Sequence, residues 1–171
     1  KNIIVPICDC IFIILFLIVG IISEKISAQN IVTLAPNAFL YDVTTNTTLI
    51  DKNSDIPMPP ASMSKLMTIY MVFERLKLGT LNLDDKFIVS RRAWRKGGSK
   101  MFVMVNKRVT VEDLLRGIIV QSGNDACIVI AEGISGTEEA FAEAMTRKAK
   151  EIGLKNSSFT NATGWPAEDH Y

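Results

Sequence analysis

The sequence predicts an α+β domain, and two observations lead to that prediction. β-Prone runs at residues 38–43 and 48–51 flank the turn-like Thr45-Asn46-Thr47, which is the pattern of a β-hairpin. Helical patterns then occupy most of the chain beyond residue 60. Early strands followed by several helices are typical of α+β domains. The 171 residues, 48% of them hydrophobic, suffice for one globular domain with a core.

The first 28 residues differ from the rest of the chain. Residues 11–22 form an uncharged apolar run, which fits the apolar part of a signal peptide better than a spanning helix of about twenty residues. Ile26-Ser27-Ala28 offers a cleavage site. An uncleaved anchor beginning near Ile3 is the alternative, although Asp9 would be costly inside a longer membrane span. Residues 1–28 are therefore predicted to be a signal peptide or N-terminal anchor, with the domain outside the cytoplasm.

A long helix is predicted over residues 62–78. Three prolines precede it, at positions 57, 59 and 60, and end any earlier strand. Gly79 is a natural C-terminal stop. Because apolar residues fall on most sides of this helix, we expect it to be buried in the middle of the domain.

The remaining elements follow a basic connection over residues 81–98. Residues 101–105 are predicted to form a short strand. Helices are predicted over residues 110–121, 125–133 and 137–152, the first capped by Thr110 and the last ended by Gly153. Further strands are expected from sequence beyond Tyr171, since both ends of the chain look incomplete.

Composition excludes several classes of protein. The net charge of +1 argues against a dedicated nucleic-acid binder. Arg91, Arg92, Arg95, Lys96 and Lys100 surround Trp94, and this basic cluster is interpreted as a solvated loop face. No disulfide framework or metal-ligand spacing occurs, so no metal or organic cofactor is expected. Cys127 is interpreted as a small buried hydrophobic residue. Core filling is the interpretation for five methionines: Met63, Met67, Met71, Met101 and Met104.

Ser62-Met63-Ser64-Lys65 is the first candidate for chemistry. Residues three apart on a helix share one face, so Lys65 can reach Ser62. A serine hydroxyl is a poor nucleophile until a base removes its proton, and a neutral lysine amine can do so. Burial in a cleft would favour that neutral form. Ser-x-x-Lys also arises by chance in a chain of this length, so the motif alone decides little.

Ser122-Gly123-Asn124 is the second candidate, in a predicted interruption between helices. A second hydroxyl can pass a proton to a leaving amine, and an asparagine amide can orient a peptide substrate. Taken alone, the segment is also an ordinary turn. His170 is the only histidine, and we interpret it as a loop residue near the cleft rather than as part of a Ser-His-Asp triad.

Together the two motifs resemble the signature of penicillin-binding proteins and related β-lactamases, which also includes Lys-Thr-Gly. The chain is similar to the D-alanyl-D-alanine carboxypeptidases within that group, from about residue 31 to residue 171. Four segments carry the resemblance: residues 60–68 (PASMSKLMT), residues 98–102 (GSKMF), residues 121–126 (QSGNDA), and residues 161–166 (NATGWP) with His170-Tyr171.

The resemblance implies a β-lactamase/transpeptidase-like fold, with a helical subdomain and an antiparallel sheet. Residues 29–171 would be the N-terminal part of its catalytic domain. Ser62 would be the nucleophile, Lys65 the general base, Ser122 the proton relay and Asn124 a substrate-binding residue. The Lys-Thr-Gly segment does not occur in these residues, so the chain as given is not expected to turn over substrate.

The resemblance also implies partners and a location. The substrate would be the peptidoglycan pentapeptide ending in D-Ala-D-Ala, with β-lactam antibiotics as covalent inhibitors and no nucleic acid. The protein would act in the periplasm or on the outer face of the bacterial cytoplasmic membrane, with possible membrane association. The alternatives are a β-lactamase of the same fold and a non-catalytic, wall-associated binding protein.

Overall fold

The computed structural model describes residues 32–171. The predicted signal segment, residues 1–28, lies outside the described residues. The chain divides into two compact units, Lys1–Lys52 and Asn53–Tyr171, and each is described by itself. Among the described residues, no helix is both long enough and apolar enough to cross a membrane.

The first unit contains the predicted hairpin. Strand β1 (Ala38–Asp42) pairs antiparallel with β2 (Thr47–Lys52). The Asp42 carboxylate accepts a hydrogen bond from the Thr44 backbone N–H at 2.8 Å, as short polar residues commonly do in turns. The hairpin prediction is confirmed, to within a residue at each strand end.

The second unit begins its helices with a tighter turn than the sequence predicted. A 3₁₀ helix, η1 (Ala61–Ser64), leads directly into α2 (Lys65–Lys77). The Met63 N–H bonds the carbonyl of Pro60, three residues back, at 3.1 Å. Ala61 has a left-handed φ of 47°, so the α-helical pattern cannot extend further upstream. Ser62 therefore lies on a 3₁₀ turn rather than on the α-helix itself.

A helical body follows α2 and includes two short strands. Its elements are β3 (Lys86–Ile88), α3 (Arg91–Arg95), β4 (Arg108–Thr110), α4 (Val111–Gln121), α5 (Asn124–Ser135) and α6 (Glu138–Glu151). Strands β3 and β4 pair antiparallel. The three predicted helices are confirmed, and Thr110 and Thr137 cap α4 and α6 with their hydroxyls.

The strand predicted over residues 101–105 is wrong. These residues form an irregular segment. The backbone N–H groups of Met101 and Val103 donate to the Asp125 carboxylate at 3.0 and 3.2 Å instead of to a neighbouring strand. The small sheet of this unit is formed by β3, which lies within the predicted connection, and by β4, for which no strand was predicted.

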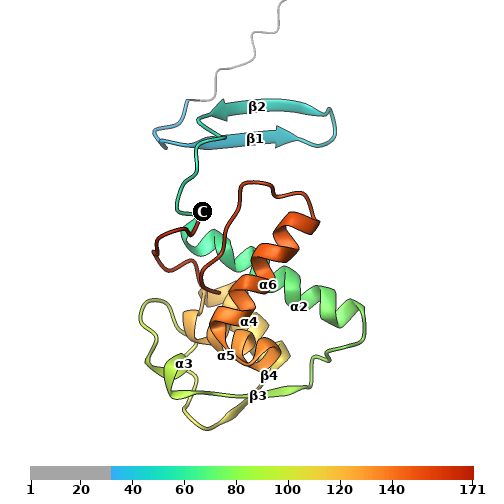
Figure 1. The fold of residues 1–171 in the computed structure, drawn as a ribbon, viewed down its shortest axis with the longest axis vertical. Helices are drawn as coiled ribbons and strands as arrows, with labels where there is room; N and C mark the ends of the chain where they lie inside the picture. Colours follow the sequence, from blue (N-terminus) through green and yellow to red (C-terminus); the bar gives the residue numbers. More distant parts are fainter. Residues whose placement is uncertain (1–31) are drawn as a thin grey trace, which may run out of the picture. The chain divides into compact units, whose positions relative to one another are not determined.

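Helix α5 lies at the centre of the second unit. It contacts α2, α3, α4, α6 and β3, and Figure 1 shows it among the other helices. Every residue from 126 to 131 is fully buried. Cys127 is one of them, which confirms its interpretation as a buried hydrophobic residue.

Helix α2 is buried on one side only, contrary to the prediction. Met67, Met71 and Val72 join the core beneath the other helices. Leu66, by contrast, is 70% exposed, and Phe73 is exposed with it. Met63 and Met104 are also exposed, so the prediction that the methionines fill the core is wrong for these two.

Candidate active site

The structure brings Ser62 and Lys65 together. The Lys65 Nζ lies 3.0 Å from the Ser62 Oγ. Side chains three residues apart eclipse on a 3₁₀ turn, which explains why the two side chains meet where η1 passes into α2. Lys65 is only 4% exposed, so its amine is held away from bulk water. This pairing is the arrangement that the Ser-x-x-Lys motif predicted.

Lys65 has a second partner that the sequence did not indicate. Its Nζ donates to the backbone carbonyl of Thr163 at 2.9 Å. Burial lowers the pKa of Lys65, and the positive charge of Lys96 lowers it further. A lowered pKa increases the neutral fraction of the amine, the form able to accept a proton. No side-chain motif could have indicated Thr163, because it contributes a backbone atom.

Ser122 and Asn124 lie at the junction of α4 and α5. Ser122 ends α4 with a left-handed φ of 54°, an uncommon conformation for a residue other than glycine. In the part of the chain that the structure describes, its hydroxyl makes no hydrogen bond to Ser62 or Lys65. The Asn124 side chain donates to the carbonyl of Gly97 at 2.9 Å. The catalytic and binding roles of Ser122 and Asn124 therefore remain predictions.

Gly98 is where the Asn124 region meets the loop that carries Thr163. A β-carbon at Gly98 would lie 2.6 Å from the Asn124 amide nitrogen and 3.2 Å from the Trp165 ring. The Lys96 ammonium lies 4.4 Å from the centre of that ring, in a cation–π contact. Three segments that are distant in sequence thus converge beside Asn124.

Asp125 is a buried carboxylate that was not among the site residues predicted from the sequence. By accepting from the backbone of Met101 and Val103, it fixes the irregular segment against the start of α5. The Asn124 N–H adds a bond to the Ser99 carbonyl at 2.8 Å. The backbone groups of the segment beside the second motif are therefore bonded to the start of α5, which explains why it forms no strand.

His170 is buried and contacts Ser64 rather than the candidate nucleophile. Its Nδ1 accepts from the Thr160 N–H at 3.2 Å, so Nε2 carries the proton and donates to the Ser64 Oγ at 2.8 Å. Burial lowers the pKa of His170, which favours this neutral form. The geometry gives no Ser-His-Asp triad at Ser62, in agreement with the lysine-base interpretation.

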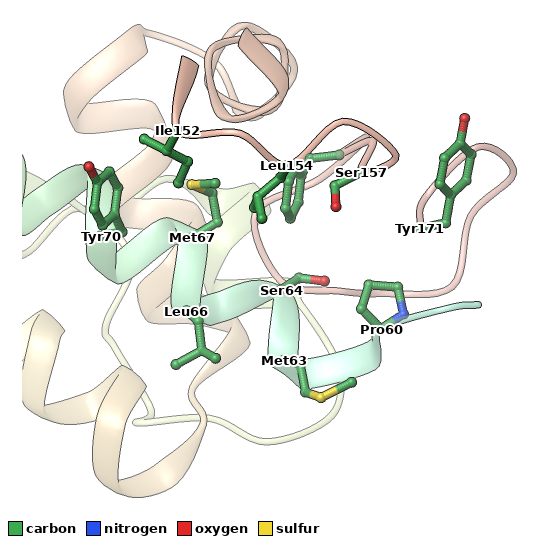
Figure 2. Close-up of a pocket in the computed structure, with 11 residues that line it drawn as sticks. Pro60, Met63, Ser64, Leu66, Met67, Tyr70, Ile152, Leu154, Ser157 and Tyr171 are labelled. Atoms are coloured by element: carbon green, nitrogen blue, oxygen red, sulfur yellow. The ribbon is translucent and has the colours of Figure 1, made fainter. Parts of the chain in front are cut away.

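A pocket of about 330 Å³ lies beside η1 and α2. Figure 2 shows Ser64 and Met67 at its wall, with Leu154, Ser157 and Tyr171 from the C-terminal segment around them. Neither Ser62 nor Lys65 lines this pocket. It is mainly apolar and is separate from the paired serine and lysine.

The basic cluster is more structured than predicted. Arg92 lies on the short helix α3 and pairs with Glu138 and Glu139 of α6, at 2.7 Å in each case. Lys100 donates to the Trp94 carbonyl at 2.7 Å. The solvated-face interpretation holds for Arg91, Arg92 and Arg95, which are exposed, although Arg92 is also ion-paired. Lys96 and Lys100 are partly buried. Over residues 32–171, no group of three or more His, Cys, Asp or Glu side chains could hold a metal ion.

Comparison with known proteins decides the family. The sequence profile of the D-alanyl-D-alanine carboxypeptidases matches residues 24–171. The chain belongs to this family. It is 44% identical over 137 residues to the D-alanyl-D-alanine carboxypeptidase DacF of Bacillus subtilis, a match covering 80% of this chain and 35% of that protein. The family's DacC of Escherichia coli is 37% identical over 138 residues, covering 77% of this chain and 34% of that protein.

Solved structures of the carboxypeptidase family share the fold. The D-alanyl-D-alanine carboxypeptidase DacD from Francisella tularensis matches with a TM-score of 0.82 at 39% identity, over 89% of this chain and 37% of that one. Penicillin-binding protein D2 from Listeria monocytogenes, in its ampicillin-bound form, matches with a TM-score of 0.68 at 28% identity, over 79% of this chain and 54% of that one. The predicted α+β, penicillin-binding-protein fold is confirmed.

The chain spans about a third of the length of the curated carboxypeptidases it matches. The family resemblance drawn from the four sequence segments is confirmed. The matched region includes both motifs, Ser62 to Lys65 and Ser122 to Asn124.

Proposed function

We propose that the protein is a serine-type D-alanyl-D-alanine carboxypeptidase that removes the terminal D-Ala from peptidoglycan stem peptides. One observation carries the proposal within this chain: a buried lysine amine, its pKa lowered by burial, lies 3.0 Å from a serine hydroxyl. Membership in a family of that activity supports it.

The geometry supports a two-step acyl transfer. The neutral Lys65 amine keeps one N–H on the Thr163 carbonyl and takes the Ser62 proton on its lone pair. The Ser62 oxygen then bonds to the carbonyl carbon of the penultimate D-Ala, and the terminal D-Ala leaves as an amine that receives a proton. Water cleaves the acyl-enzyme ester and restores the serine hydroxyl. Ser122 is proposed to relay the proton to the leaving amine.

The proposed partners follow from this reaction. The substrate is a cell-wall pentapeptide ending in D-Ala-D-Ala, and a β-lactam would acylate Ser62 in its place. The ampicillin-bound Listeria relative supports the second point. The activity as a whole is proposed for the protein made from the complete gene.

Mass spectrometry after exposure to penicillin tests the proposal. Protein expressed from the complete gene should gain one adduct, mapped to the peptide that contains Ser62, and a Ser62→Ala variant should gain none. A stable adduct together with release of D-Ala from a pentapeptide establishes the carboxypeptidase. Rapid loss of the adduct with hydrolysed drug would indicate a β-lactamase, and no adduct at all would leave a non-catalytic binding protein.

We also propose that residues 1–28 direct export, which places the domain in the periplasm or on the outer face of the cytoplasmic membrane. The apolar run at residues 11–22 and Ala28 support this. N-terminal sequencing of the mature protein distinguishes a cleaved signal peptide from an uncleaved membrane anchor. A chain starting at Gln29 indicates cleavage, whereas an intact N-terminus in the membrane fraction indicates an anchor.

A further inference from the structure

Glu138 is a buried carboxylate with no part in the reaction proposed above. It is the first residue of α6 and is 3% exposed. Its Oε2 pairs with the Arg92 guanidinium at 2.7 Å, and its Oε1 accepts from the backbone N–H of Ala162 at 3.1 Å. A carboxylate can be buried only where charge and hydrogen bonds satisfy it, and here both oxygens are engaged.

Ala162 and Thr163 are held from their other side by α2. The Ala162 carbonyl accepts from the Thr68 hydroxyl at 2.8 Å. The next carbonyl, that of Thr163, accepts from Lys65 at 2.9 Å. Lys65 and Thr68 lie three residues apart on one face of α2. The loop is therefore clamped between the Glu138 carboxylate on α6 and two donors on α2.

The contacts that hold Ala162 and Thr163, here called the clamp, include one of the two hydrogen bonds of the candidate base, Lys65. A lysine side chain has many rotamers, and an amine acts on a hydroxyl only when it is held in the right place. Lys65 is fixed by two acceptors, the Ser62 Oγ and the Thr163 carbonyl. Glu138 holds the N–H of Ala162, the residue directly before the one that supplies this carbonyl.

We propose that Glu138, oriented by Arg92, is a positioning residue for the general base. It anchors the Ala162 N–H, thereby sets the Thr163 carbonyl, and through that carbonyl holds the Lys65 amine against Ser62. The inference rests on the proposed function, because it takes Lys65 as the base.

Glu139 provides a matched control on the same helical turn. It also pairs with Arg92 at 2.7 Å, but its side chain is 63% exposed and makes no bond to Ala162. Glu138→Gln and Glu139→Gln each remove one negative charge next to Arg92. Only Glu138→Gln disturbs the bond to Ala162. If the glutamine oxygen accepts from the Ala162 N–H, its NH₂ group faces the Arg92 guanidinium, and two hydrogen-bond donors then oppose each other.

The experiment compares wild type and both variants, each expressed from the complete gene. It measures the rate constant of penicillin acylation, kcat and KM on a D-Ala-D-Ala peptide, and the thermal midpoint. Glu138→Gln should lower the acylation rate and kcat by about 10- to 100-fold, with KM close to that of wild type. Glu139→Gln should keep the wild-type acylation rate, since the anchor remains.

Three results would overturn the proposal: Glu138→Gln acylating at the wild-type rate, Glu139→Gln losing as much as Glu138→Gln, or KM rising with kcat unchanged. If Glu138→Gln does not fold, the Thr68→Val variant tests the proposal instead. It removes the hydrogen bond from Thr68 to the Ala162 carbonyl while keeping the shape of the side chain. Reduced kcat with unchanged KM in Thr68→Val supports the clamp, and unchanged kcat overturns it. Failure of the wild type to be acylated is a different result, which would remove the proposed function itself.

Discussion

Gly164 lies against the backbone carbonyl of Ala61, the residue before the candidate nucleophile. A β-carbon added at Gly164 would lie 1.7 Å from the Ala61 oxygen, and Gly164 also has a φ of +77°. Only glycine allows the loop that carries Thr163 to approach η1 this closely. This contact joins the two segments whose atoms surround the Lys65 amine.

We therefore expect Gly164→Ala to lower both stability and acylation of Ser62. The added carbon must push the loop away from Ala61, which moves the Thr163 carbonyl away from Lys65. Gly153→Ala is the control, because Gly153 has a φ of +95° but nothing within 4 Å of its added carbon. Unfolding and penicillin labelling measure the two effects. Equal losses in both variants would show that backbone strain, and not the contact, is responsible.

Ser122 has a strained backbone at a candidate catalytic position. Its left-handed φ of 54° costs an alanine or serine about 1 kcal/mol, a cost that glycine avoids. Ser122→Gly should therefore be more stable than Ser122→Ala by about 1 kcal/mol in urea unfolding. Both variants lack the hydroxyl, so both should show reduced kcat on a D-Ala-D-Ala peptide if Ser122 relays the proton. Equal stability of the two variants would contradict the strain, and a wild-type kcat in both would contradict the relay.

The acylation rate should depend on pH through Lys65. Only the neutral amine accepts the Ser62 proton, so the rate should rise with pH as the ammonium deprotonates. Burial lowers the pKa of Lys65, which moves the midpoint of that rise below the ordinary lysine value. Stopped-flow acylation by a fluorescent penicillin measures the profile. Lys65→Arg stays charged and should remain slow at every pH, whereas a flat wild-type profile would contradict the lysine base.

His170 should make the stability of the protein fall in acid. Burial lowers the pKa of His170 below the ordinary 6.5, so the unfolded chain binds this proton more readily than the folded one. The stabilisation that the neutral His170 contributes is fully present above pH 6.5. It is lost as the pH falls from 6.5 through the lowered pKa of the folded state. Protonation also places a proton on Nδ1, which now accepts from Thr160.

The pH dependence of thermal unfolding tests this, with His170→Gln as the comparison. Glutamine does not titrate, so the variant should lose less stability than wild type between neutral and mildly acidic pH. Parallel curves for the two proteins would show that another group is responsible.

The sequence indicated those elements whose signals are local. The hairpin at β1 and β2 follows from β-prone runs around a turn, and Thr110 and Thr137 cap their helices as their residue type predicts. The strand pair β3 and β4 was missed because three-residue strands are too short for a period of two to stand out. Residues 101–105 have the sequence pattern of a strand. They form none because two of their backbone N–H groups donate to the carboxylate of Asp125, more than twenty residues away in the chain.

The candidate site likewise has one part that follows from local sequence and another that depends on distant contacts. The sequence by itself determined the family, the fold class and the Ser62–Lys65 pairing, since two side chains three residues apart on a helical turn lie on the same face. The tertiary structure decided which groups surround that pair: the Thr163 carbonyl, the Glu138 carboxylate and the close approach of Gly164. The Thr163 and Gly164 contacts join residues about a hundred positions apart, and the Glu138 contact joins residues 24 positions apart. All three act through backbone atoms or through the absence of a side chain. No pattern of residue types along a chain specifies such contacts, because they exist only once helices pack.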